Sequence, residues 1–159
     1  MKQALLLILF LGFFSEILNA QNFDLGSKEL NVGDVYIPKP KIMFNFDRET
    51  IIPKCYPQLD SIAKFLLKHD SLIIEIGVHM DSRGSDKYSR RLDQNRAESV
   101  KEYLVNKGIR QDRMVAIGYG ESQFIISEEE IDKMESAREK EEAHAINRRV
   151  EFKILNIIN

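Results

Sequence analysis

Two charged residues, Asp81 and Arg96, lie at positions from which their side chains could bind a charged ligand. Asp81 follows an alternating apolar stretch that begins at Leu72, at the point where a strand would run into a glycine-containing turn. Arg96 falls within the apolar stripe of the helix expected next, and a guanidinium is almost never buried alone. If the two side chains converge, the aspartate could hold an ammonium group and the arginine a carboxylate, which together would bind a zwitterion.

A second explanation for Arg96 stays open at this point. Asp93 lies three positions earlier on the same expected helix and could pair with the arginine locally. A continuous helix from Ser85 would also place Arg96 roughly 16 Å along its axis. Either the turn after Asp81 folds back or a ligand bridges that gap, so sequence spacing does not choose between a local pair and a binding site.

The elements that must position these residues alternate along the chain. Alternating apolar residues predict strands at 42–46, 72–80, 115–119 and 150–154. Helical spacing predicts a helix from about 86 to 107, ended by Gly108, and an earlier helix near Pro57 whose apolar stripe is formed by Leu59, Ile62, Ala63, Leu66 and Leu67. The order strand, helix, strand, helix, strand, strand predicts an α/β two-layer sandwich with the helices on one face of a mixed sheet.

The charge of the chain is balanced overall but not locally. The 159 residues include 23 Lys and Arg against 25 Asp and Glu, a net charge of -2 that gives no reason to expect nucleic acid as a partner. Residues 121–146, which we call the acidic segment, hold nine acidic residues against three basic ones. The segment therefore carries -6 and the rest of the chain +4. We expect it to form an extra insert of loop and helix, rich in helix formers from 128 to 145.

The residues that could support catalysis or metal binding do not form a recognisable set. The three histidines have no metal-ligand spacing, and one cysteine builds neither a disulfide nor a Cys-based zinc site. His79 shares a strand face with Glu75 and Asp81, but a histidine hydrogen-bonded near a strand end is the simpler interpretation. Cys55 has no base nearby in its segment and is expected to be buried as a small apolar residue. The sequence therefore predicts no enzyme, no cofactor and no metal.

The first twenty residues predict a secretory signal. Lys2 precedes an unbroken apolar run from Ala4 to Phe14, which is too short for an ordinary membrane-spanning helix, and Ala20 fits a cleavage site. An uncleaved anchor is the alternative. Cys55 lies far from this junction, so we expect an exported chain that is not lipidated. Residues 21–41 are expected to be a short leader into a single domain at 42–155.

A set of ordered motifs resembles the C-terminal domains of OmpA-like proteins. Residues 77–97 are similar to the pattern G-x-H-T-D-x-x-G-x-x-x-Y-N-x-x-L-S-x-x-R-A, with Met80, Ser89 and Asp93 at positions where the family usually has Thr, Asn and Ser. Residues 44–47, 118–121 and 147–151 resemble further motifs of the family. The resemblance covers about 42–154, which is nearly the whole chain after the predicted signal.

The resemblance implies non-covalent binding of peptidoglycan in the periplasm, at the cell wall or outer membrane. In such domains the residues that correspond to Asp81 and Arg96 hold the diaminopimelate of the stem peptide, which presents a free ammonium and a free carboxylate. Arg148 is expected to flank the site, with Asp47 and Ser89 as weaker matches. Outer-membrane proteins are a further expected class of partner. The three departures from the pattern leave an alternative open, in which the chain keeps the fold as an envelope assembly protein with weak or no wall binding.

Overall fold

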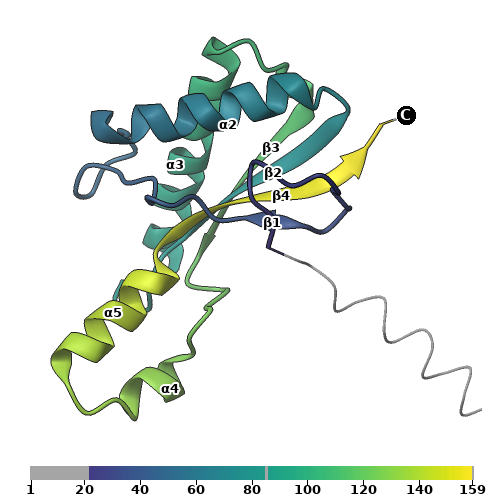
Figure 1. The fold of residues 1–159 in the computed structure, drawn as a ribbon. Helices are drawn as coiled ribbons and strands as arrows, with labels where there is room; N and C mark the ends of the chain where they lie inside the picture. Colours follow the sequence, from purple (N-terminus) through teal and green to yellow (C-terminus); the bar gives the residue numbers. More distant parts are fainter. Residues whose placement is uncertain (1–21, 85, 159) are drawn as a thin grey trace, which may run out of the picture.

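Figure 1 presents a computed structural model that describes residues 22–84 and 86–158. The predicted signal at 1–20 lies outside the described residues. The four strands, in chain order, are β1 (Val35–Tyr36), β2 (Leu72–His79), β3 (Met114–Gly120) and β4 (Arg149–Ile157). They form one sheet in the order β1-β4-β2-β3, in which β2 and β3 are parallel and the other pairs antiparallel. The mixed sheet predicted from the sequence is confirmed.

Two long helices cover one face of the sheet (Figure 1). They are α2 (Tyr56–Lys68), which follows the 3-10 turn η1 (Pro53–Cys55), and α3 (Asp86–Asn106), which is followed by the 3-10 turn η2 (Gln111–Arg113). Gly108 has a φ of 97°, a left-handed conformation that ends α3 as its position predicted. None of the described helices is both long and apolar enough to cross a membrane.

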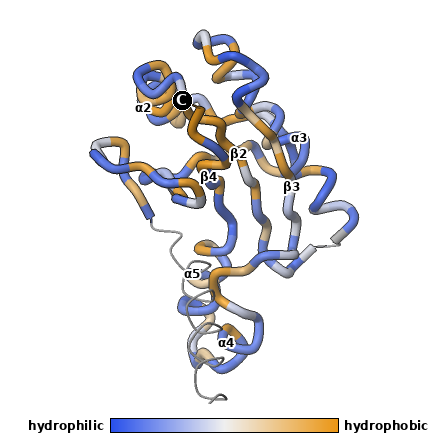
Figure 2. The backbone as a smooth tube through the Cα atoms, turned by 90° about the vertical axis from the view of Figure 1, so that its right-hand side faces the viewer, coloured by the Kyte–Doolittle hydropathy of each residue, from blue (hydrophilic) through white to orange (hydrophobic). Residues whose placement is uncertain are grey.

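The core lies between these helices and the sheet, because alternate residues of each inner strand point the same way. Ile74, Ile76 and Val78 of β2 are buried there with Phe152 and Ile154 of β4. Figure 2 shows the same concentration of hydrophobic residues along β2, β4 and α2. Cys55 is buried in this core, as the sequence predicted.

Glycine at position 118 lets α3 lie directly against β3. A Cβ atom built on Gly118 would lie 2.1 Å from the backbone nitrogen of Gln94. Gln94 also bonds to this strand: its Nε2 donates to the Ala116 carbonyl at 3.0 Å, and its Oε1 accepts from the Gly118 N–H at 2.8 Å. The middle of α3, which carries Asp93 and Arg96, is therefore fixed relative to the sheet.

Two details differ from the sequence prediction. The expected strand at 42–46 is reduced to one antiparallel bridge between Phe44 and Ile51, and Phe46 is 98% exposed. The first strand of the sheet is instead β1, within the segment expected to be a leader, and β4 supplies its pairing partner. In α2, Phe65 is buried while Leu67 points outward, because the apolar face is rotated relative to the predicted stripe.

The acidic segment contains two short helices, α4 (Glu128–Asp132) and α5 (Ala137–Asn147). Each begins with a capping box, in which Ser127 and Glu130, or Ser136 and Glu139, satisfy each other's backbone N–H groups. Figures 1 and 2 both place the pair at one end of the sheet, away from α2. α5 leads directly into β4, so the end of this helix and the start of that strand are held together.

Candidate functional site

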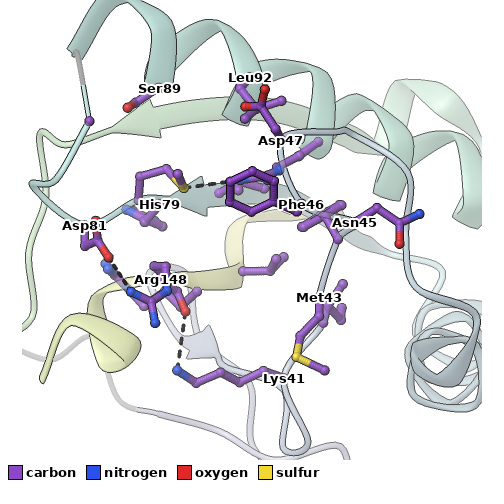
Figure 3. Close-up of a pocket in the computed structure, with 18 of the residues that line it drawn as sticks. Lys41, Met43, Asn45, Phe46, Asp47, His79, Asp81, Ser89, Leu92 and Arg148 are labelled. Carbon is purple, nitrogen blue, oxygen red and sulfur yellow. Dashed lines mark hydrogen bonds and ion pairs between the residues drawn. The ribbon is translucent and has the colours of Figure 1, made fainter. Parts of the chain in front are cut away.

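A cavity of about 690 Å³ opens at the end of the sheet where β2 finishes and β4 begins. Its lining comes from the 41–47 loop, the turn after β2, the first half of α3 and the junction of α5 with β4. All five residues predicted as site residues line it, namely Asp47, Asp81, Ser89, Arg96 and Arg148. Figure 3 shows Asp81 and Arg148 facing each other there, with Lys41 approaching from the loop.

Asp81 is buried and engaged by two arginines. Its Oδ2 accepts from Nη2 of Arg83 at 2.7 Å and from Nη1 of Arg148, and its Oδ1 accepts from the backbone N–H of Arg83 at 3.1 Å. Burial acts to raise the pKa of Asp81, but these hydrogen bonds outweigh it and hold the pKa below its usual value. The carboxylate is therefore ionised at neutral pH.

Glu141 of α5 binds the same two arginines from the solvent-exposed side. Its Oε1 accepts from Nη2 of Arg148 at 2.7 Å, and its Oε2 accepts from Nη1 of Arg83 at 2.8 Å. These hydrogen bonds lower the pKa of Glu141, with the bond from Arg148 contributing most. Asp81, Arg83, Glu141 and Arg148 thus form a closed ring of alternating charge, which we call the ion-pair ring.

Arg96 lies on a different wall of the cavity and is held mainly by uncharged groups. Its Nε donates to the backbone carbonyl of Arg48 at 3.1 Å, and Nη1 lies 3.2 Å from the sulfur of Met80. The guanidinium also stacks over Phe44, 5.1 Å from the ring centre. Only 11% of the side chain is exposed, so its orientation is set by its neighbours.

Asp93 pairs with Arg96, as one of the two sequence explanations proposed. The Nη1–Oδ1 distance is 3.4 Å, longer than a good charge-assisted bond, and the other oxygen of Asp93 is buried without a hydrogen-bond partner. Burial raises the pKa of Asp93 to about 7, although Arg96 and the Gly120 N–H act to lower it. The local pair is therefore weak near neutral pH, since a large fraction of the carboxyl is protonated.

The two weaker matches lie on the cavity wall with their side chains engaged. Asp47 has a left-handed φ of 56° and accepts a hydrogen bond from the hydroxyl of Tyr88. Ser89 is buried, and its hydroxyl donates to Glu121 at 2.9 Å. The structure brings both residues to the cavity but gives each a partner within the chain.

A buried polar cluster lies beside the cavity, and two of its members, His79 and Arg149, contribute to the cavity lining. The ring of His79 stacks on Tyr119 at 4.6 Å, and its Nε2 lies 3.6 Å from Glu151. Burial acts to raise the pKa of Glu151, but His79 and Arg149 outweigh it and lower the pKa to about 2. Arg149 also donates to the carbonyls of Gln123 and Asn147, each at 3.2 Å. The backbone on either side of Arg148 is therefore anchored.

Several site residues were not predicted from the sequence. Arg83 had a local signal, because it lies two residues after Asp81 in the same turn. Lys41, which donates to the carbonyls of Ala145 and Arg148, and Glu141 had none, because their contacts span many residues of chain. Across 22–84 and 86–158, no group of three or more His, Cys, Asp or Glu side chains is arranged to hold a metal ion.

The chain is similar to proteins of the bacterial outer membrane and cell wall. Outer membrane porin F of Pseudomonas fluorescens is 33% identical over 113 residues, which are 71% of this chain and 32% of that protein. A peptidoglycan-associated lipoprotein of Buchnera aphidicola is 37% identical over 101 residues, which are 64% of this chain and 55% of that protein. The matches thus span about a third to a half of these relatives.

Solved structures agree with the architecture. The peptidoglycan-associated lipoprotein of Burkholderia pseudomallei superposes with a TM-score of 0.57 at 25% identity, over 71% of this chain and 87% of that one. The family model described as OmpA family matches residues 43–138, which include most of the cavity wall and more than half of the sequence. On this match and on the shared fold, the chain belongs to the OmpA family.

Proposed function

We propose that this protein binds peptidoglycan non-covalently and without catalysis, through the diaminopimelate of the stem peptide, and so tethers or organises the cell envelope. The observation that carries the proposal is one cavity that has Asp81, Arg96 and Arg148 on its walls. It thereby offers both an anionic group for an ammonium and cationic groups for a carboxylate. Two relatives named peptidoglycan-associated lipoproteins support the same substrate class.

Each of the predicted site residues has a distinct role in this proposal. Asp81 accepts the ligand ammonium, since its lowered pKa keeps it ionised. Arg96 donates to the ligand carboxylate, because Phe44 and the Arg48 carbonyl orient its guanidinium toward the cavity. Arg148 lies beside Asp81 and offers the ligand carboxylate a second cation. Asp47 and Ser89 form part of the cavity wall.

The proposal implies a location and a set of partners. Peptidoglycan lies in the periplasm of diderm bacteria, so we place the mature chain there, exported by the predicted signal at 1–20 and associated with the wall or the outer membrane. Outer-membrane proteins are the second class of partner proposed.

Co-sedimentation with purified diaminopimelate-type sacculi tests the proposal. The mature protein should pellet with the sacculi at moderate salt, while Asp81→Ala and Arg96→Ala should stay in the supernatant. Asp112→Ala and Arg110→Ala are matched controls, because these residues form an exposed pair with each other outside the cavity lining. Lysine-type sacculi should bind poorly, since lysine lacks the second carboxylate. A wild-type protein that remains soluble would contradict wall binding.

The alternative function is envelope assembly with the fold kept and wall binding weak or lost. It is favoured by one specific observation: Asp81 already has two arginines as partners and Arg96 already has Asp93. In that case the wild type and all four variants would remain in the supernatant, and cross-linking in cells would connect the chain to envelope proteins instead.

A further inference from the structure

Glu141 makes the same contacts that a ligand carboxylate would make at this site. Its two oxygens bridge two guanidiniums, at 2.7 Å from Arg148 and 2.8 Å from Arg83. Planar guanidinium groups bind carboxylates in this manner in proteins generally. Both arginines also bind Asp81, so one carboxylate inside the ring and one outside it share the same pair of cations.

The ring leaves Asp81 with its hydrogen-bonding capacity largely used. Four donor groups from Arg83 and Arg148 point at its two oxygens. Three of these donors bind Oδ2 and only the backbone N–H of Arg83 binds Oδ1. A ligand ammonium that binds Oδ2 must therefore displace an arginine, and an arginine that moves needs another anion. An incoming zwitterion supplies both groups at once: its ammonium replaces an arginine at Asp81, and its carboxylate replaces Glu141 at that arginine.

Glu141 is positioned beside the two arginines by the helix α5, whose backbone is fixed at both ends, and not only by the contacts of its own side chain. The helix is capped by Ser136 at its start, and Lys41 binds carbonyls at its end. Asn147 fixes it to the preceding loop, because its side chain accepts from the backbone N–H groups of Ile125 and Ile126. The Glu141 side chain itself is 53% exposed, so it can leave the arginines while the helix stays in place.

We propose that Glu141 is an internal competitor for the ligand carboxylate, which occupies Arg83 and Arg148 and is displaced when a zwitterion binds. This inference rests on the proposed function and adds a residue that sets its selectivity. A simple cation cannot replace Glu141 at the arginines, and a simple anion leaves Asp81 bound as before. Glu141 thus makes the site favour ligands that carry both charges.

Isothermal titration with a soluble diaminopimelate-containing muropeptide tests the inference. Glu141→Gln keeps the length of the side chain but removes the competing charge, so it should bind roughly twofold to fivefold tighter than wild type, the range for losing an exposed ion pair. Glu142→Gln is the matched control, because Glu142 is adjacent and exposed but pairs with Arg138. Its affinity should equal that of wild type. The gain in Glu141→Gln should shrink at high salt, which screens exposed pairs.

The outcomes separate this inference from the function on which it rests. If wild type binds and Glu141→Gln binds equally or more weakly, Glu141 does not compete and the inference is wrong, while the proposed function stands. If wild type and both variants fail to bind, the proposed function is wrong and the inference with it. Binding by Glu141→Gln alone would support the inference in its strongest form. Thermal unfolding of each variant confirms that the fold is retained.

Discussion

The two charged walls of the cavity use the same residue types in opposite ways. On one wall Asp81 belongs to the ion-pair ring, where two carboxylates and two arginines balance each other and the outer members, Arg83 and Glu141, are 50% and 53% exposed. On the other wall Arg96 is nearly buried, with Asp93 as its acidic neighbour and with Phe44, the Met80 sulfur and a backbone carbonyl as its remaining partners.

The difference shows how burial decides what an ion pair does. In the ring, hydrogen bonds from arginines lower the pKa of Asp81 and of Glu141, so all four groups are charged. Around Arg96, burial raises the pKa of Asp93 to about 7. The ring is a set of exchangeable partners, whereas Arg96 is a fixed cation whose local partner is only partly ionised.

The largest expected effect is on binding to a diaminopimelate muropeptide. Arg96→Ala should weaken it roughly 100-fold, because it removes an oriented and nearly buried cation. Arg148→Ala should weaken it only about tenfold, because Arg148 is partly exposed and Arg83 remains beside Asp81. Isothermal titration measures both, with Arg110→Ala as the control. The reverse order would show that the ring, rather than Arg96, makes the stronger contact with the ligand carboxylate.

Asp93→Asn should stabilise the protein at neutral pH by roughly 1–3 kcal/mol, since Asn avoids the cost of ionising a buried carboxyl. The folded-state pKa of about 7 lies above the ordinary aspartate value of 3.8, so between these values the folded chain holds a proton that the unfolded chain has lost. The free energy of unfolding of wild type should therefore fall as pH rises through this window, relative to the variant. Urea denaturation at pH 4.5 and pH 8 measures the difference. Parallel pH profiles for the two proteins would contradict the buried-carboxyl explanation.

Asp81→Asn should change the free energy of unfolding in the opposite direction to Asp93→Asn, and by a smaller amount. The lowered pKa of Asp81 means that its contribution is present above the usual value of 3.8 and is lost as pH falls below it. The variant should be less stable than wild type by about 1 kcal/mol at pH 7, with the gap narrowing as the pH falls below 3.8. Thermal unfolding across this range measures it, with Asp112→Asn as the control for an exposed, paired aspartate. A stabilised Asp81→Asn protein would remove the distinction between the two walls.

Much of the fold could be predicted because its signals are local. The predicted bounds of β2, α3, β3 and β4 lie within three residues of the observed ones. Each element has a regular spacing of apolar residues, and glycines or polar residues mark where that spacing stops. The first strand could not be placed in the same way. β1 has only two residues, too few for a period, and its partner β4 lies more than a hundred residues later. The alternation at 42–46 was misleading, because Phe46 points into solvent.

The site was predictable in part for the same reason. Asp81 and Arg96 stood out because each conflicts with its local pattern, and their positions matched a family motif. The ring could not be found this way, because Glu141 lies 58 residues from Arg83 and looks like any other acidic residue on a helix. Which glutamate of the acidic segment reaches the arginines depends on how α5 meets β4, and that is a tertiary property.

β4 also has a mechanical consequence for a protein proposed to tether an envelope. The strand starts directly after Arg148 and is an inner strand, with β1 on one side and β2 on the other. A pull applied at Arg148 along the strand would load both ladders in shear, so that their hydrogen bonds share the tension and must rupture together. An edge strand in the same place would be peeled away one bond at a time and would yield to a far smaller force.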